Sequence, residues 1–210
     1  MPRRSPRPRR VSAGVSAVTA LRARPHARVE VELDGERWRT LPAEVILAAG
    51  LVVGAELGRE RARRLNRELR RHEAMSRAAR ALARRDLSER ELSERLERSR
   101  VAPAARDEAV ASLARVGIVD DERLARRRAE LLAERGSGDA FIRHDLTGRG
   151  VAEELVEAAL AALEPEHARA ARILRERGSS LKTARFLARK GFAEESIRDP
   201  VAEDAPPAVR

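Results

Sequence analysis

The most compact group of side chains that could bind a metal ion is the acidic run Asp120, Asp121 and Glu122. Clustered carboxylates can ligate a cation, so a metal site is one interpretation of this run. The run also follows Gly117 and precedes an apolar stretch with helical spacing. Carboxylates in that position cap the free backbone amides of a helix and meet the positive end of its dipole. We therefore favour a helix N-terminus over a metal site.

No other pattern in the sequence indicates catalysis. No Gly-rich loop ending in Lys-Ser/Thr follows a predicted strand, and no GxSxG motif supports a Ser-His-Asp triad. Cysteine is absent, which excludes disulfides, thiol catalysis and Cys-ligated zinc, and suits a reducing compartment. The histidines lie far apart, without the spacing of paired metal ligands: His26, His72, His144 and His167. We expect a protein that is not an enzyme and has no cofactor and no metal.

A repeated spacing of apolar residues predicts the helices that must position any functional side chain. Leu82, Leu132 and Leu174 each stand 13 or 14 residues before a second leucine, which stands five residues before a Val or Phe. The second leucine and the Val or Phe that follows it are Leu96 and Val101 in the first repeat, Leu146 and Val151 in the second, and Leu187 and Phe192 in the third. Periods of roughly 40 to 50 residues are typical of stacked helical repeats, each of which buries its apolar face against its neighbours. Function is therefore expected on an extended surface.

The composition agrees with a helical protein. Apolar residues make up 42% of the 210 residues but aromatic residues only 2%, so the core must consist of Leu, Val, Ile and Ala. Such a core favours closely packed helices. No run approaches the roughly 20 apolar residues that a membrane span needs. No apolar signal core follows the Pro/Arg-rich start, so we expect a cytoplasmic protein.

A small β-structure is predicted before the repeats. Alternating apolar and polar residues precede Asp34-Gly35, and a second alternating stretch surrounds Trp38. This pattern predicts a hairpin with a two-residue primed turn, which needs positive φ at both central residues, and places Val31 opposite Trp38. Residues 18–22 are interpreted as a third strand, since an isolated hairpin is marginal in water.

Helix signals follow the hairpin. Thr40 is predicted to be the N-cap of a short helix, with Pro42 in its first turn and Gly50 at its end. Residues 59–85 contain no Pro or Gly and carry apolar residues at helical spacing, which predicts one long basic helix. In the last repeat, Pro200 is predicted to cut the final helix short.

The predicted fold is mostly α, with tandem three-helix repeats in an elongated curved array after a small β-hairpin-containing N-terminal cap. The expected segments are a disordered basic arm (1–17), a small α+β cap (18–58), the long basic helix with the first repeat (59–119), the second repeat (120–163), a truncated third repeat (164–200) and a disordered tail (201–210).

The positive charge is unevenly distributed. The formal net charge is +10, and residues 1–28 contribute eight arginines without an acidic residue. Residues 59–85 contain eleven arginines against three glutamates. Other segments are net acidic, so the folded part has patches of both signs. Such patches suit contacts with protein and nucleic acid together, and these contacts would weaken with salt.

The segment GIVDDERLA and the turns LTGRGV and LARKGF resemble the hallmark of the RecX family of recombinase regulators. The hairpin, short helix and long basic helix also resemble the N-terminal extension of longer members. The sequence departs from the family pattern at Leu124, where an aromatic is expected, and at Arg100, where glycine is usual. The residues that carry the resemblance are Gly117, Asp120, Asp121, Leu124, Ala125, Gly150 and Gly191.

The resemblance implies a non-enzymatic regulator whose partner is the RecA filament on single-stranded DNA, and we expect a monomer. Members of the family lie along the filament and modulate RecA, usually by inhibiting its ATPase, strand exchange and coprotease activities. That role belongs to DNA repair, recombination and the SOS response. Direct DNA contact through the basic faces and the N-terminal arm is also expected.

We predict that basic helix faces of the repeats contact the filament. The alternative is an independent helical nucleic-acid-binding protein that acts without RecA through its basic arm and long helix. The predicted filament-contacting residues are Arg84, Arg85, Arg126, Arg127, Arg143, Arg149, Arg185, Arg189 and Lys190.

Overall fold

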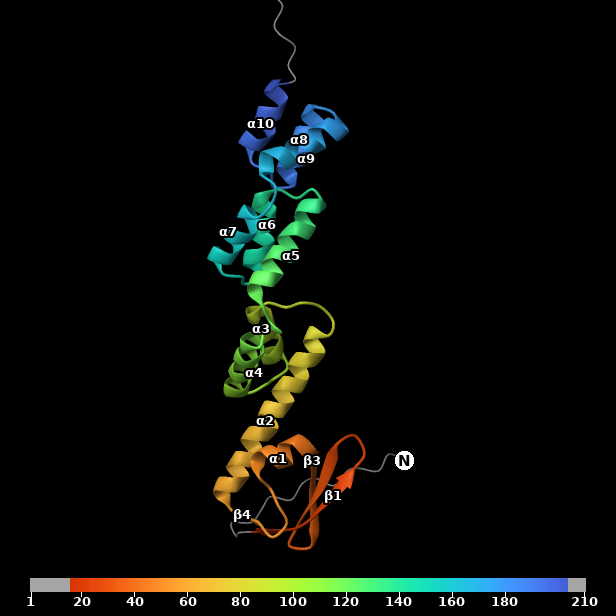
Figure 1. Ribbon diagram of the computed structural model, residues 1–210, viewed down its shortest axis with the longest axis vertical. Helices are drawn as coiled ribbons and strands as arrows, with labels where there is room; N and C mark the ends of the chain where they lie inside the picture. Colours follow the sequence, from red (N-terminus) through yellow and green to blue (C-terminus); the bar gives the residue numbers. More distant parts are fainter. Residues whose placement is uncertain (1–15, 204–210) are drawn as a thin grey trace, which may run out of the picture. The chain divides into compact units, whose positions relative to one another are not determined.

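The computed structural model describes residues 16–203, which form two compact units (Figure 1). The N-terminal unit contains described residues up to Arg80 together with Leu96–Ala109. The C-terminal unit contains Ala81–Arg95 and the described residues from Val110 onward. Most of the predicted arm and tail lies outside the described residues. Ser16 and Ala17, assigned to the arm, instead begin the first strand.

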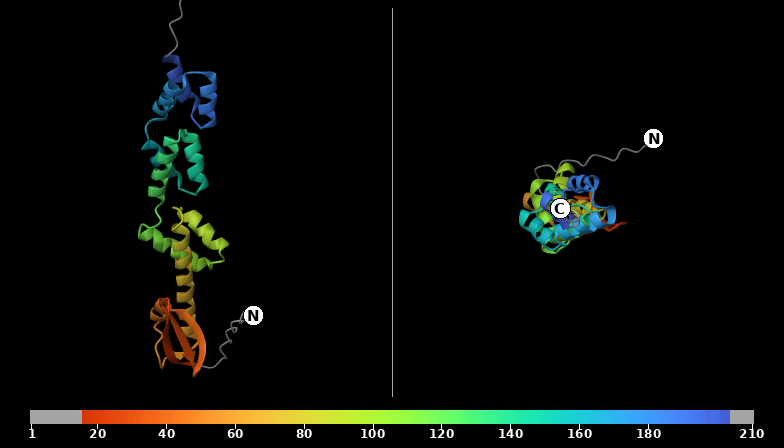
Figure 2. Two further views of the ribbon diagram at one scale, coloured as in Figure 1. Left: turned by 90° about the vertical axis from the view of Figure 1, so that its right-hand side faces the viewer. Right: turned by 90° about the horizontal axis from the view of Figure 1, so that it is seen from above.

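The N-terminal unit contains an antiparallel sheet of four strands in the order β3-β2-β1-β4. The third strand predicted from residues 18–22 is confirmed as part of β1. The strands are β1 (Ser16–Arg24), β2 (Arg28–Leu33), β3 (Glu36–Pro42) and β4 (Glu56–Leu57). In Figure 2 they curl against the first turns of the long helix α2 (Arg59–Leu82), whose Leu65 belongs to the same apolar core.

The hairpin turn has the predicted geometry, but the register beyond it differs. Asp34 and Gly35 have φ angles of 51° and 82°, as a primed turn requires. Val31, however, pairs with Arg39 and not with Trp38. The register shifts between Val31 and the next residue, because a β-bulge places one extra residue in β3. The predicted pairing of Val31 with Trp38 is therefore wrong.

The short helix α1 (Ala43–Ala49) begins later than predicted. Thr40 is not its N-cap, because it pairs with Glu30 in the β-ladder and β3 continues to Pro42. Pro42 is the N-cap, without a side-chain hydrogen bond. Gly50 ends the helix as predicted, with a φ of 63°.

The long basic helix is confirmed, although it ends at Leu82, before the predicted Arg85. Its buried positions beyond Leu65 are filled by alanines, and Ala74 packs against Ala105 and Ala109. Small side chains at these positions let the helices approach closely. The arginines of α2 remain on its exposed faces.

Most of the apolar residues that recur at the predicted spacing are buried in the core. In the C-terminal unit, α5, α6 and α7 pack together and share one apolar cluster, and α8, α9 and α10 share another (Figure 1). The helix α10 continues past Pro200, so the prediction that Pro200 shortens it is wrong; the proline removes one N–H donor near the end of the helix. The helices after α2 are α3 (Glu89–Arg98), α4 (Pro103–Arg115), α5 (Asp121–Glu134), α6 (Asp139–Gly148), α7 (Glu153–Ala161), α8 (Glu166–Arg177), α9 (Leu181–Arg189) and α10 (Glu194–Glu203).

In each repeat, the second leucine and the Val or Phe five residues later belong to a Schellman motif, which ends a helix. Its defining hydrogen bond joins the N–H two residues past the cap to a carbonyl in the last turn, often with an apolar contact between the same residues. The bond recurs as Val101 N to Leu96 O (3.1 Å), Val151 N to Leu146 O (3.2 Å) and Phe192 N to Leu187 O (3.2 Å). The residue before each Val or Phe has positive φ: Arg100, Gly150 and Gly191.

Arg100→Gly is expected to stabilise the protein by about 0.5–1 kcal/mol. Arg100 is exposed and has a φ of 58°, a conformation that strains a residue with a Cβ atom. The greater entropy that glycine loses on folding offsets part of this gain. Urea unfolding should show a higher midpoint at an unchanged slope. Arg67→Gly, on an exposed position inside α2, is the control and should lower the midpoint. A lower midpoint for both variants would contradict the strain at Arg100.

Candidate interaction surface

The acidic run is a helix N-terminus, as the sequence interpretation favoured. Asp120 is the N-cap of α5, and its carboxylate accepts a hydrogen bond of 2.8 Å from the backbone N–H of Arg123. Gly117 lies in the preceding turn with a φ of 70°. Ala125 is fully buried in the core of α5, α6 and α7. These residues therefore position α5.

Asp121 joins α5 to α3. Its Oδ1 accepts a hydrogen bond of 3.0 Å from the backbone N–H of Glu89, at the start of α3. Burial raises the pKa of the Asp121 carboxyl above its ordinary value. The next repeat has the same arrangement, because Glu166 at the start of α8 accepts from the N–H of Asp139 at the start of α6 (2.7 Å). Glu166 was not predicted from the sequence, although it is the first residue of α8, as Asp121 is the first residue of α5.

The glycine turns contact the starts of these same helices. Ser88 Oγ donates to the carbonyl of Arg149 (2.6 Å), beside Gly150. In the next repeat, Gly138 N donates to the carbonyl of Lys190 (2.8 Å), beside Gly191. Gly150 and Gly191 thus lie where one repeat packs on the next.

A buried arginine that the sequence analysis missed completes the second of these junctions. The side chain of Arg169 is only 3% exposed. It donates to the carbonyls of Glu164 and Ser137, both at 2.9 Å, and forms an ion pair with Asp139. Its guanidinium also lies over the ring of Phe192. Among so many arginines, only the tertiary contacts distinguish this one.

Arg149, Arg85 and Arg143, all predicted to contact the filament, form close ion pairs within the C-terminal unit. Arg149 lies between Asp145 (3.0 Å) and Glu91 (3.2 Å), and Arg85 lies 3.0 Å from Glu91. The pKa of the Asp145 carboxyl is lowered, chiefly by a two-pronged hydrogen bond from Arg128 and also by Arg149. Arg143 makes a similar two-pronged contact with Glu157, at 2.7 and 3.0 Å. These arginines have structural partners, and their filament contacts stay predictions.

The other predicted contact residues are less constrained. Arg126 and Arg127 lie 3.9 Å from Glu122 and Asp86, in exposed pairs that contribute little to stability. The remaining four predicted cations have no carboxylate oxygen within 4.0 Å among residues 16–203: Arg84, Arg185, Arg189 and Lys190.

Three of these four cations lie together at α9. Arg185 and Arg189 are exposed and one helical turn apart, opposite Leu187 in the core. Lys190 follows directly, with its ammonium 5.9 Å from the centre of the Phe186 ring. We call Arg185, Arg189 and Lys190 the α9 basic face. Their charges are available to an acidic partner without breaking an ion pair in the described part of the chain.

Neither a metal site nor a membrane span is found in the described part of the chain. No group of three or more His, Asp or Glu side chains in residues 16–203 is arranged to hold a metal ion. No helix there combines the length and apolar composition that crossing a bilayer requires.

Helices joined at their N-termini from one repeat to the next, together with the small sheet that precedes them, define a helical-repeat protein. The sequence matches RecX, second three-helix domain, over residues 120–160. It is 33% identical over 131 residues to the regulatory protein RecX of Halorhodospira halophila (strain DSM 244 / SL1), a match that covers 58% of this chain and 81% of the relative. The chain belongs to the RecX family, as its motifs predicted, and is therefore a RecX-type regulatory protein.

Two crystal structures show the same fold. One, of a regulatory protein RecX, has a TM-score of 0.75 and 18% identity, over 90% of this chain and 100% of that chain. The other, of RecX from Lactobacillus salivarius, has a TM-score of 0.56 and 16% identity, over 64% of this chain and 96% of that chain. These matches support the predicted fold of a small sheet followed by three-helix repeats.

Proposed function

We propose that this protein binds the RecA filament on single-stranded DNA and inhibits RecA ATPase, strand exchange and coprotease activity. Membership of the RecX family carries the proposal, and the α9 basic face supports it. A RecA-type filament presents protein and phosphate surfaces, and exposed cations without carboxylate partners suit such a target. The protein acts by binding, in the cytoplasm, as a regulator of DNA repair, recombination and the SOS response.

The direct test is ATP hydrolysis by RecA on single-stranded DNA while this protein is titrated. Binding of the protein to the same DNA without RecA is measured in parallel. We expect loss of ATPase activity at protein concentrations that leave bare DNA largely free. Unchanged ATPase despite firm DNA binding would refute the proposal and favour an independent nucleic-acid-binding protein.

Charge reversal on the α9 basic face is expected to weaken this inhibition. Arg185→Glu with Arg189→Glu should raise the half-inhibitory concentration tenfold or more, about 1.4 kcal/mol. Arg115→Glu with Arg175→Glu is the matched control, because both arginines are exposed, lie outside the predicted contact set and give the same change in charge. The control should shift the half-inhibitory concentration by less than about threefold. Equal shifts for the two pairs would contradict a specific role for α9.

The same assay tests the predicted contact on α5. Arg126→Glu with Arg127→Glu should weaken filament binding and leave the helical content unchanged, since both side chains are exposed and their ion pairs are long. Circular dichroism checks the helical content. Normal inhibition by this variant would remove α5 from the contact surface.

A further inference from the structure

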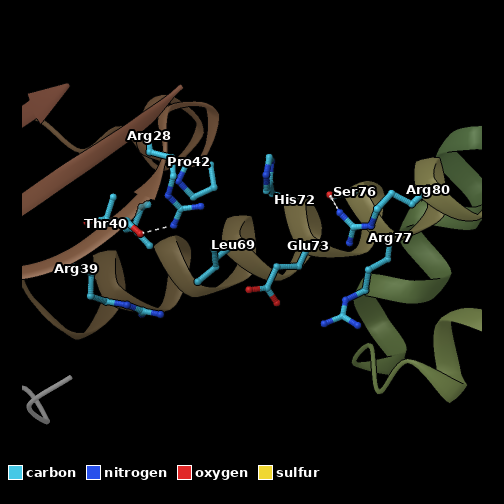
Figure 3. Close-up of a pocket in the computed structure, with 11 residues that line it drawn as sticks. Arg28, Arg39, Thr40, Pro42, Leu69, His72, Glu73, Ser76, Arg77 and Arg80 are labelled. Atoms are coloured by element: carbon cyan, nitrogen blue, oxygen red, sulfur yellow. Dashed lines mark hydrogen bonds between the residues drawn. The ribbon is translucent and has the colours of Figure 1, made fainter. Parts of the chain in front are cut away.

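The N-terminal unit has a groove between β3 and α2 that no known role of the chain explains (Figure 3). Its volume is about 320 Å³, similar to that of a small ligand site. Arg28 and Arg39 reach it from the sheet, and Arg77 and Arg80 from α2. We call it the β3–α2 groove.

The guanidinium groups of the groove keep most of their donors free. Three of them donate to neutral oxygens: Arg28 to the carbonyl of Thr40 (2.7 Å), Arg80 to Ser76 Oγ (2.8 Å) and Arg77 to the carbonyl of Ser99 (3.0 Å). Arg39 lies over the ring of Trp38 at 5.5 Å. A guanidinium has five N–H donors, so each can bind a further anion. None of the four arginines has a carboxylate within 4.0 Å in residues 16–203.

Acidic side chains do not neutralise the groove. Glu73 is the one carboxylate among its lining residues, against four guanidinium groups. His72 also lines it, with its Nδ1 3.2 Å from Glu44. This charge pattern differs from that of the C-terminal unit, where carboxylates lie close to most of the buried or half-buried guanidinium groups. An electropositive groove without neutralising partners favours an anionic occupant.

The positions of the cations favour a chain of anions over a single one. The lining residues of α2 run from Leu69 to Arg80, which is about 16 Å along the helix axis. Figure 3 shows Arg28 and Arg39 near the first of these turns and Arg77 and Arg80 near the last. Two separated pairs of guanidinium groups can each hold a phosphate of the same strand. Arginine suits this task because its planar fork binds phosphate oxygens in pairs.

We propose that the β3–α2 groove binds the phosphodiester backbone of single-stranded DNA. A flexible strand can follow a groove with cations at both ends, whereas a duplex is stiff and presents its phosphates on a convex surface. No Phe, Tyr or Trp side chain lines the groove to stack on the bases, so binding is expected to depend little on the base sequence. The proposal concerns this chain alone and does not rest on an action on RecA.

The test is binding of a fluorescently labelled oligo-dT strand to the full-length protein without RecA, followed by anisotropy. Arg77→Glu with Arg80→Glu should weaken binding tenfold or more. Arg28→Glu with Arg39→Glu, at the sheet end of the groove, should do the same. The matched control is Arg63→Glu with Arg70→Glu, because both residues are exposed on α2 and do not line the groove. They also do not line another cavity of the N-terminal unit, which Arg61, Arg64 and Arg67 border near the start of α2. The control should weaken binding by less than about threefold.

Salt dependence separates phosphate contacts from general attraction to a basic helix. Each phosphate contact contributes about 0.7 to the slope of log affinity against log salt for a single strand. Each groove variant removes one pair of guanidinium groups and so one phosphate contact, and should therefore lose about 0.7 from this slope, and the control variant should keep it. Circular dichroism checks that each variant is folded. Because the two groove variants change different residues, the test stays valid if one of the variants unfolds.

Competitors identify the occupant. Unlabelled oligo-dT should displace the probe at lower concentration than a duplex of equal length, inorganic phosphate or polyglutamate of equal charge. Equal losses in the groove and control variants, or no loss in either groove variant, would overturn the proposal. Stronger displacement by the duplex would replace the single strand with duplex DNA, and stronger displacement by polyglutamate would make the groove a site for acidic protein segments.

Discussion

Gly138→Ala is expected to destabilise the C-terminal unit by about 3 kcal/mol. A Cβ atom on Gly138 would lie 2.3 Å from the backbone carbon and oxygen of Gly191 and from the nitrogen of Phe192. All three are backbone atoms, so no side chain can turn away to relieve the clash. Separating the two segments would break the hydrogen bonds from Gly138 N to Lys190 O and from Ala140 N to Gly191 O.

Thermal unfolding followed by circular dichroism measures this effect. The midpoint should fall by about 10 °C or more. Gly148→Ala is the control, because Gly148 lies in the same helix, and a Cβ atom there would have no heavy atom within 4 Å. The control should leave the midpoint unchanged or raise it slightly, since alanine favours helix more than glycine does. Equal midpoints for the two variants would show that the junction can move apart without cost.

Leu132→Asp is expected to unfold the core formed by α5, α6 and α7. The Leu132 side chain is 5% exposed and belongs to the same apolar cluster as Ile142 and Leu146. The substitution removes this packing and buries a carboxylate without a partner, at a cost of about 4 kcal/mol or more. Much of the helical signal in circular dichroism should disappear at room temperature.

The neighbouring residue provides the control for this prediction. Leu131 is on the same helix and is 36% exposed. Leu131→Asp makes the same chemical change where water can solvate the carboxylate, so the helical signal should remain. Limited proteolysis should cleave the Leu132 variant rapidly within residues 121–161 and leave the Leu131 variant resistant. If both variants keep their helices, the cluster around Leu132 does not hold the repeat together.

Local sequence patterns predicted the features that depend on a few neighbouring residues. The leucine register predicted the repeats, because a helix that ends in a Schellman motif often has an apolar contact between residues five apart, with a residue of positive φ between them. Asp34-Gly35 predicted the hairpin turn for a similar reason. The acidic run was recognisable as a helix N-terminus because the amide that Asp120 caps is only three residues away. Each of these interactions closes within a short stretch of backbone.

Tertiary packing decided the partners of the charged residues. The sequence shows many arginines, and it did not distinguish Arg149, which pairs with Glu91 across 58 positions, from Arg185, which has no carboxylate oxygen within 4.0 Å in residues 16–203. It also did not reveal that Asp121 and Glu166 cap helices of another segment. The β3–α2 groove likewise exists only after the sheet packs on α2.

The sequence by itself thus determined the family, the repeats and some of the helix ends, since these follow from backbone hydrogen bonds between near neighbours and from apolar periodicity. The tertiary structure decided which cations are held in ion pairs and which remain available to a partner. An ion pair forms only where folding brings two distant side chains within about 4 Å, and the local sequence does not encode that distance.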